Sequence, residues 1–454
     1  MESTLAQRPV GPDDLPALKQ RVQDVLDEAR RQGVAACEAL ALRSEQLSQQ
    51  VAGDEVGPAE DQRQHHLGLA LYVDGRKGEV LHQLDDDFSP AEAVAQALAI
   101  ARAADADPHL GLAQADSLAW DHPDLDLYQD WPTAADTLLD MARRCDQSAL
   151  QTDARIVGSR GTIVSGQAQS QAYGNSHGFL AGYCHSQFML NCYIRAEHNG
   201  IRRTGGSSTA QRSLAQLGDS ARIGNAAARR AIDYLGDAKL QGTSWPQVFS
   251  PQASVWLLAA FIEAIGGEAV SRGASVLSGM LDKPLFGPDI SIVEFPHQYQ
   301  GIGSLPYDNE GVAVSTRTFV ADGRLQSYAL DAASARRLEM KNTGNASLAF
   351  EQARNLSFTP GLATQAQLLA QMNRGVFVAE ARAPQVDVQQ GTFSMKAIGF
   401  WVENGQIQYP LSPITLSGDL KDIFGKVLAI GSDVEQMSRI KGTSVLVDAL
   451  TINH

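Results

Sequence analysis

The sequence predicts an α+β protein: an N-terminal α+β region of long helices and antiparallel strands, then a β-rich C-terminal domain containing one buried helix. The chain has 454 residues, more than one compact core usually holds. Helical and alternating segments interchange in the first half, whereas alternation dominates the second. Asp74-Gly75, Asp322-Gly323 and Asn404-Gly405 are the dipeptides of tight hairpins, because both residues of such a turn adopt positive φ.

The first half opens with a helix that follows Asp13-Asp14 and ends at Gly33, where a positive φ is favourable. A hairpin turns at Asp74-Gly75, and Ser89-Pro90 provides the cap and first turn of an alanine-rich helix. A further helix follows Pro132, and Gly- and Ser-containing turns then predict several antiparallel strands. The segments that follow Gly33 are the strands His66–Val73 and Lys77–Leu81, the helix Ala91–Ala104, the strand region Ile156–Ile194 and the helix Leu214–Leu235.

Residues 236–246, G-D-A-K-L-Q-G-T-S-W-P, are the best boundary between the halves, because glycine, proline and polar residues gather there. We therefore expect domains at residues 1–240, with a possible subdivision near 130, and 241–454. The second domain begins with one helix, Pro251–Val270, and short helices are expected at Leu330–Leu338 and Ala366–Gln371. Its remaining length is predicted to be mostly strand.

Composition excludes several classes of protein. A net charge of −15 and a pI near 5.1 argue against direct nucleic-acid binding, which needs a basic face. The N-terminus lacks the basic and apolar regions of a signal peptide, and the most apolar run, Val255–Ile265, is too short to span a membrane. Four cysteines without a C-x-x-C pair fit a reducing compartment. We expect a cytoplasmic protein.

Several motifs, in a fixed order, resemble the TldE (PmbA) subunits of the TldD/TldE metallopeptidase family, which is also called the modulator of DNA gyrase family. The longest is G-F-W-V-E-N-G-Q-I-Q-Y-P. Each motif alone is weak, and the resemblance rests on their number and order: Asp121–Tyr128, Gly174–Gly178, Gly182–Cys184, Ser304–Gly311, Asp322-Gly323, Ala335-Arg336, Thr343-Gly344, Gly399–Pro410, Leu420–Asp422 and Gly431–Asp433.

The resemblance implies a subunit of a cytoplasmic peptidase that processes unfolded or extended polypeptides. In that family the TldD subunit holds zinc with an H-E-x-x-x-H helix and a later cysteine. The histidines and the thiolate bind the metal, and the glutamate is the general base. The partner implied here is a TldD-like subunit, with a homodimer possible when the chain is alone.

The positions of this chain that match the zinc site carry other residues. Aligned on Ser275–Gly279, the zinc helix matches Pro251–Val270, so that Leu258, Ala259 and Glu263 stand for the first His, the Glu and the second His. The family's cysteine falls near Gly442, and this chain has no cysteine after Cys192. No catalytic residue and no bound metal are therefore expected, with zinc in the partner. Substituting Leu258→His, Ala259→Glu, Glu263→His and Gly442→Cys is expected to restore zinc binding.

Three other polar residues are candidates for contact with a peptide or a partner. His177 lies in the turn-forming G-N-S-H-G, and no second ligand at a suitable spacing favours a metal there. Asp308 and Glu310 could act as an acid pair on one strand, but Pro306 and Gly311 favour a turn with a structural or contact role. Glu263 has no titratable neighbour at helical spacing and is interpreted as a surface residue.

Two functional hypotheses follow. The favoured one is a TldE-like, probable non-catalytic subunit of a two-subunit zinc peptidase that helps to hold extended peptides. The alternative is a regulatory or binding protein of the gyrase-modulator type, with no proteolytic activity of its own. A serine hydrolase and a nucleotide-binding protein are disfavoured, because neither G-x-S-x-G nor a P-loop motif occurs.

Overall fold

The computed structural model describes residues 9–454 except 130, 132, 348–352, 383, 436–437 and 454. The N-terminal residues 1–8, used above to judge a signal peptide, lie outside this set, as do residues 130 and 132 near the expected subdivision and helix start. Within the described chain no helix is both long enough and apolar enough to cross a bilayer.

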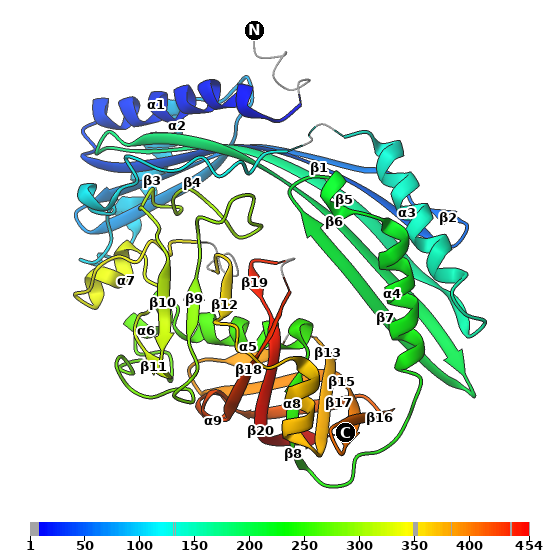
Figure 1. Cartoon of the computed structure of the whole chain (residues 1–454). Coiled ribbons are helices and arrows are strands. Elements are labelled where there is room, and N and C mark those ends of the chain that lie inside the picture. Colours follow the sequence, from blue (N-terminus) through cyan, green and yellow to red (C-terminus); the bar gives the residue numbers. More distant parts are fainter. Residues whose placement is uncertain are drawn as a thin grey trace.

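The first half is built on one long, curved antiparallel sheet (Figure 1). Its strands lie in the order β4-β3-β1-β5-β6-β7, and the short β2 pairs with β1. The alternation of buried and half-exposed residues along β5 and β6 is typical of a sheet with one face covered. The bounds are β1 Ala36–Ala52, β2 Glu55–Val56, β3 Glu60–Val73, β4 Arg76–Gln83, β5 Ile156–Asn175, β6 Leu180–His198 and β7 Ile201–Gln211.

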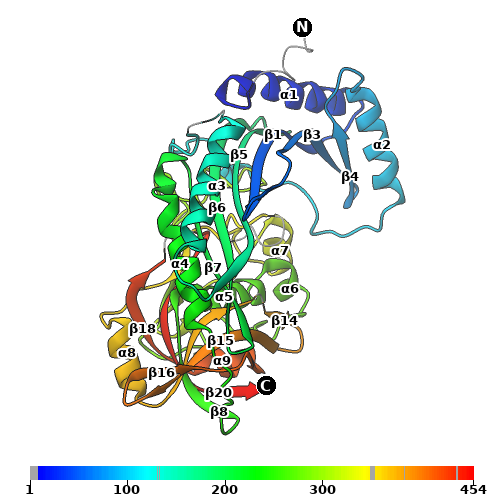
Figure 2. The ribbon, with the colours of Figure 1, turned by 90° about the vertical axis from the view of Figure 1, so that its right-hand side faces the viewer.

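Four helices cover the outer, convex face of this sheet. These helices bury apolar side chains such as Val22 of α1 and Leu138 of α3 against strand residues such as Ala41 and Phe188. The first half also contains 3-10 turns at Pro12–Asp14, Ala115–Ser117 and Ala215–Leu217. Figure 2 shows the sheet from the side, with the C-terminal strands below it. The helices are α1 Leu15–Arg31, α2 Pro90–Ala103, α3 Ala135–Leu150 and α4 Ser220–Asp233.

The second half contains a strand ring and a smaller sheet. The ring closes because β13 pairs with both β8 and β15, in the order β13-β8-β20-β17-β15, with β14, β16 and β18 attached. The smaller sheet has the order β11-β10-β9-β12-β19. The ring strands are β8 Ser244–Phe249, β13 Gly375–Ala381, β15 Thr392–Glu403, β17 Ile414–Asp419 and β20 Thr443–Asn453, and the attached strands are β14 Gln385–Asp387, β16 Gln406–Pro410 and β18 Val427–Val434. The smaller sheet consists of β9 Ile292–Glu294, β10 Arg317–Ala321, β11 Arg324–Leu325, β12 Leu356–Phe358 and β19 Ile440–Lys441.

Helix α5, Pro251–Ala264, packs between these two sheets, and its buried side chains share one core with both. Leu258 and Phe261 are fully buried. The remaining helices of this half are α6 Gly267–Ser271, α7 Ala332–Arg337, α8 Gln365–Met372 and α9 Leu420–Gly425. The α+β class, the long N-terminal helices with an antiparallel sheet and the β-rich C-terminal region with a buried helix are confirmed.

Several element predictions need correction. The predicted helix Pro251–Val270 is two helices, because the backbone of Gly266 leaves the helix and bridges to Ala329. Ile156–Ile194 is antiparallel strand as predicted, but it forms two long strands instead of several. Strand β1 was not predicted, since its Ala-, Leu- and Glu-rich sequence has helical propensity. Pairing with β3 on one side and β5 on the other determines its conformation.

Two buried or half-buried arginines join the halves. The guanidinium of Arg212, which follows β7, donates to the carbonyl oxygens of Gly301 at 2.8 Å and Ile302 at 2.9 Å. From the other direction, Arg336 of α7 donates to the carbonyl oxygens of His109, Gly111 and Leu112. Because a guanidinium bridges several carbonyls at once, these contacts fix the sheet relative to the C-terminal half.

Candidate functional site

Helix α5, which the sequence resemblance aligns with a zinc helix, presents no ligand set at the aligned positions. Leu258 is fully buried in the C-terminal core, whereas Glu263 lies at the exposed side of the helix. Partial burial raises the pKa of the Glu263 carboxyl above its usual range. Ala259 offers no donor atom. The side chains at these three positions therefore do not fit zinc, which needs nitrogen, sulfur or oxygen ligands converging on one point.

Gly442 packs against the first turn of α5. A Cβ atom placed there would lie 1.7 Å from the carbonyl oxygen of Pro251 and 3.0 Å from Oγ of Ser254. Ser254 Oγ also donates to the Thr443 carbonyl at 2.7 Å and accepts from the Thr443 N–H at 3.2 Å, which holds β20 against the helix. The gain in zinc affinity expected from Gly442→Cys stays a prediction, and it would require β20 and the helix to move apart, because the helix backbone occupies the space of the side chain. No group of three or more potential metal ligands occurs among the residues the structure describes.

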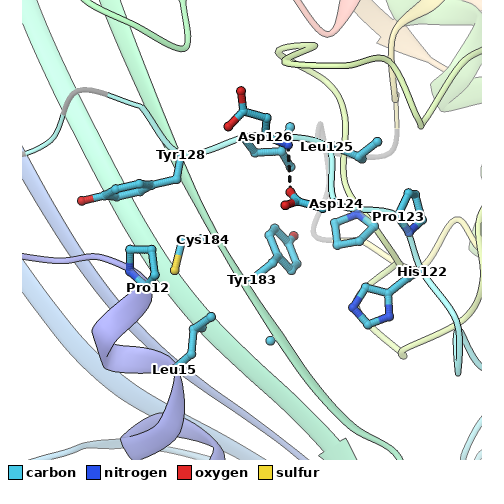
Figure 3. A pocket seen from close by; sticks show the side chains of 13 residues that line it. Pro12, Leu15, His122, Pro123, Asp124, Leu125, Asp126, Tyr128, Tyr183 and Cys184 are labelled. Atoms are coloured by element: carbon cyan, nitrogen blue, oxygen red, sulfur yellow. Dashed lines mark hydrogen bonds between the residues drawn. The ribbon is translucent and has the colours of Figure 1, made fainter.

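A pocket of about 390 Å³ lies where three of the family-like motifs meet (Figure 3). One wall is the segment His122–Tyr128, another is Gly182–Cys184 of β6, and Pro306 and the start of α1 complete it. These segments are far apart in the sequence. The sheet brings them together, since the motif containing Pro306 packs through Tyr307 against Tyr183, with ring centroids 5.4 Å apart.

The polar groups of this pocket are engaged with the protein and form no reactive pair. Asp126 accepts from Tyr299 Oη and Gln300 Nε2, both at 2.6 Å, and these bonds lower the pKa of its carboxyl. His122 Nδ1 lies 3.1 Å from the Ala119 carbonyl oxygen. Burial raises the pKa of the Cys184 thiol to about 11, so the thiol is protonated at neutral pH and is a poor nucleophile. The pocket can bind a ligand, but its geometry supplies no nucleophile with a base.

One edge of β6 is open at the pocket. Pairing of β6 with β7 begins only at Phe188, and the Ser186 N–H donates to the Leu127 carbonyl at 2.9 Å. Past this hydrogen bond the segment that precedes Leu127 diverges from β6. Gly182 and Cys184 of β6 therefore line the pocket between the two segments. An open strand edge presents main-chain donors and acceptors that suit an extended chain.

Asp308 and Glu310 lie in a turn, as the flanking residues suggested. The Asp308 carboxylate is 1% exposed and accepts from the N–H groups of Glu310, Val312 and Ala346 at 2.8–3.0 Å. Burial raises its pKa to about 6, although the charge of Arg354 opposes the shift. These bonds give Asp308 a structural role.

Glu310 and His177 also support local structure, but neither is fully buried. Glu310 is half-buried and accepts from the Ala332 N–H at 2.9 Å; burial and the negative charge of Asp308 raise its pKa well above the usual range. His177 is exposed in the turn between β5 and β6, with Nε2 3.2 Å from the Ala113 carbonyl oxygen. Contact of these two residues with a peptide or a partner stays a prediction. The pocket-lining Asp124, Asp126 and Tyr128 were not singled out, although their motif was the available signal.

Comparison with known proteins agrees with the motifs. Residues 128–235 match the PmbA/TldA metallopeptidase central domain, and residues 242–454 match the PmbA/TldA metallopeptidase C-terminal domain. The metalloprotease PmbA of Escherichia coli O157:H7 is 35% identical over 392 residues, which is 85% of each chain. The chain belongs to the PmbA/TldD metallopeptidase family. A PmbA homolog of Haemophilus influenzae is 32% identical over 96% of both chains.

Solved structures of the family share the fold. A candidate modulator of DNA gyrase from Thermotoga maritima superposes with a TM-score of 0.86 at 24% identity, covering 96% of this chain and 100% of that one. TldE from Thermococcus kodakarensis gives a TM-score of 0.82 at 16% identity, covering 95% and 99%. At these identities the structures establish the architecture alone, so the activity of this family member must be argued from its own residues.

Proposed function

We propose that this chain is the zinc-free, TldE-like subunit of a two-subunit cytoplasmic metallopeptidase that processes extended polypeptides. The observation that supports the proposal is the lack of a ligand set at the aligned positions of a retained family fold. Leu258 is buried in the core, Ala259 has no donor atom and the Pro251 carbonyl fills the space beside Gly442. The partner is then a TldD-like subunit, which supplies zinc and the base that activates water.

In this arrangement the chain contributes binding surface. The family-like motifs converge on a pocket beside an open strand edge, and no nucleophile–base pair lines that pocket. Such a surface can orient a substrate for chemistry that a second subunit performs.

The test is reconstitution with the TldD-like protein of the same cell. Each protein is purified alone and mixed, and cleavage of an unfolded casein substrate is measured together with complex formation by size-exclusion chromatography. We expect a stable mixed complex, cleavage by the mixture and none by this chain alone. A partner in which the Glu of its H-E-x-x-x-H motif is replaced by Gln is the matched control and should bind without cleaving. Cleavage by this chain alone, or no complex at micromolar concentrations, would contradict the proposal.

A further inference from the structure

The concave face of the N-terminal sheet is a regular array of uncharged polar side chains. In β-strands alternate residues point to opposite faces. Ala168 and Phe188 are fully buried beneath the helices, whereas Gln167 and Gln187 on the other face are half-exposed. We call this other surface the glutamine face; it comprises alternate residues of β1 from Leu42 to Gln50, β3 from Gln62 to His66, β5 from Ile163 to Gln171 and β6 from Tyr183 to Asn191.

Strand register places glutamines side by side on this face. Gln62 lies opposite Gln46, Gln46 opposite Gln167, and Gln167 opposite Gln187, so that one row of amides crosses four strands. Neighbouring strands are about 4.8 Å apart. Along β5, glutamine recurs at 167, 169 and 171. The face therefore carries amides in both directions of the sheet.

The concave side of the sheet, which carries the glutamine face, points toward the C-terminal half (Figure 1) and continues into the pocket. Leu40, Tyr173 and Tyr183, on the same side of the sheet, pack with Tyr307 and Val312 of the C-terminal half. Tyr183 also lines the pocket beside the open edge of β6. A chain bound in that pocket can thus extend over the glutamine face.

The middle of this face carries no charge, unlike an ordinary solvated face. Within the bounds given above none of the positions is Asp, Glu, Lys or Arg, although such residues make up 20% of the chain. An acid, Glu60 of β3, lies at the edge of the face opposite Ser48. His185, within the face, is neutral because burial lowers its pKa to about 3. A face without formal charge neither selects nor repels acidic or basic side chains. The ligand group that suits such a face is the uncharged main chain, which every polypeptide has.

The amides are available for a ligand. Gln169 Nε2 donates to Gln171 Oε1 at 2.7 Å. By contrast, the side chains of Gln46, Gln62, Gln167 and Gln187 make no hydrogen bond to any described residue. Each amide offers both donors and an acceptor. An extended chain repeats every two residues, about 6.8 Å, which is also the spacing of Gln167 and Gln169 along β5. Gln171, the next glutamine along the strand, is buried.

We propose that the glutamine face binds the main chain of an extended polypeptide through its amide side chains, largely independently of sequence. The proposal rests on the proposed function and specifies how this subunit holds substrate. The proposal predicts that removing main-chain N–H groups from the bound polypeptide weakens binding, whereas exchanging its side chains does not.

The probe is a fluorescein-labelled twelve-residue peptide of Ser, Thr and Ala, with binding to the mixed complex measured by fluorescence anisotropy. N-methylation of alternate residues should weaken binding about tenfold or more, as expected for the loss of two or more hydrogen bonds. Reversing the sequence, or raising salt from about 0.05 to 0.5 M, should change Kd less than about twofold, since no ion pair contributes.

The protein variant is Gln167→Glu with Gln169→Glu, which keeps side-chain size, removes amide donors and should weaken binding about tenfold. Gln96→Glu with Gln147→Glu, at exposed positions of α2 and α3, adds the same charge on the helical side and should leave Kd unchanged. Equal affinity for the N-methylated peptide, or no binding by the wild-type complex, overturns the proposal while leaving the subunit assignment intact. Failure of the two proteins to associate refutes the proposed function instead.

Discussion

Replacing Gly442 by alanine tests how tightly β20 packs against the start of α5. The added Cβ would lie 1.7 Å from the Pro251 carbonyl oxygen, whereas ordinary contacts begin near 3.4 Å. Neither neighbour is a flexible side-chain end, because one belongs to the backbone of α5 and the Ser254 hydroxyl is held by Thr443. Strand and helix must separate by more than an ångström to admit one methyl group.

Two opposing effects determine how much Gly442→Ala changes the free energy of unfolding. Overpacking of a buried site costs about 1–3 kcal/mol, and the rigid backbone here places Gly442→Ala at about 3 kcal/mol. Alanine also restricts the unfolded chain more than glycine does, and this effect stabilises the folded state by only about 0.4–1 kcal/mol. A net loss of about 2 kcal/mol in a region of about 200 residues lowers Tm by about 4–8 °C.

Differential scanning calorimetry of the purified variant measures this shift. Gly425→Ala is the matched control, because its added Cβ would meet only the Leu285 carbonyl oxygen at 3.9 Å and the residue ends helix α9. It should unfold at or slightly above the wild-type temperature. If Gly442→Ala melts within 1 °C of Gly425→Ala, the contact between β20 and the start of α5 does not constrain this position.

Three further outcomes follow from described contacts. Burial and neighbouring negative charge raise the pKa of Glu310 in the folded state, so above pH 4.5 this carboxyl holds its proton more in the native than in the unfolded chain, and its contribution to stability falls as pH rises toward neutrality. In urea denaturation, the free energy of unfolding of Glu310→Gln should therefore fall less, or rise more, from pH 5 to pH 7.5 than that of the wild type. The same pH dependence in both proteins would refute the assignment. Arg212→Met should lower the free energy of unfolding by about 2 kcal/mol, because the charged hydrogen bonds to Gly301 and Ile302 are lost. The control Arg202→Met, at an exposed position, should lower it by less than about 0.5 kcal/mol. Equal denaturation midpoints for the two variants would contradict the role of Arg212 in joining the two halves. Thr364→Ala removes the side-chain cap of α8 and should cost about 1 kcal/mol by the same assay, an effect that a Thr364→Ser variant should largely avoid.

The sequence identified elements whose determinants are local. Asn404 and Gly405 adopt φ values of 54° and 71°, as their hairpin requires, and Ser89 caps the helix that follows it. Strand β1 was missed because its conformation depends on two partners far away in the chain. The break between α5 and α6 likewise depends on the bridge from Gly266 to Ala329.

For the candidate site, the sequence shows which residue occupies each position, but it does not show which atoms surround that position. The resemblance aligns Leu258, Ala259 and Glu263 with zinc-site positions, and their residue types can be read directly from the sequence. That the Pro251 carbonyl blocks Gly442 required coordinates. Similarly, Gln46, Gln62 and Gln167 are unremarkable residues until strand register aligns them.

The most direct test of the central assignment is the zinc stoichiometry of the two subunits. Native mass spectrometry of this chain, of the TldD-like protein and of their complex reports metal per subunit after exhaustive dialysis. The account predicts no tightly bound zinc on this chain, and one zinc per mixed pair that is retained by the partner. One zinc per chain on this protein alone, lost on addition of a chelator and accompanied by casein cleavage, would contradict it.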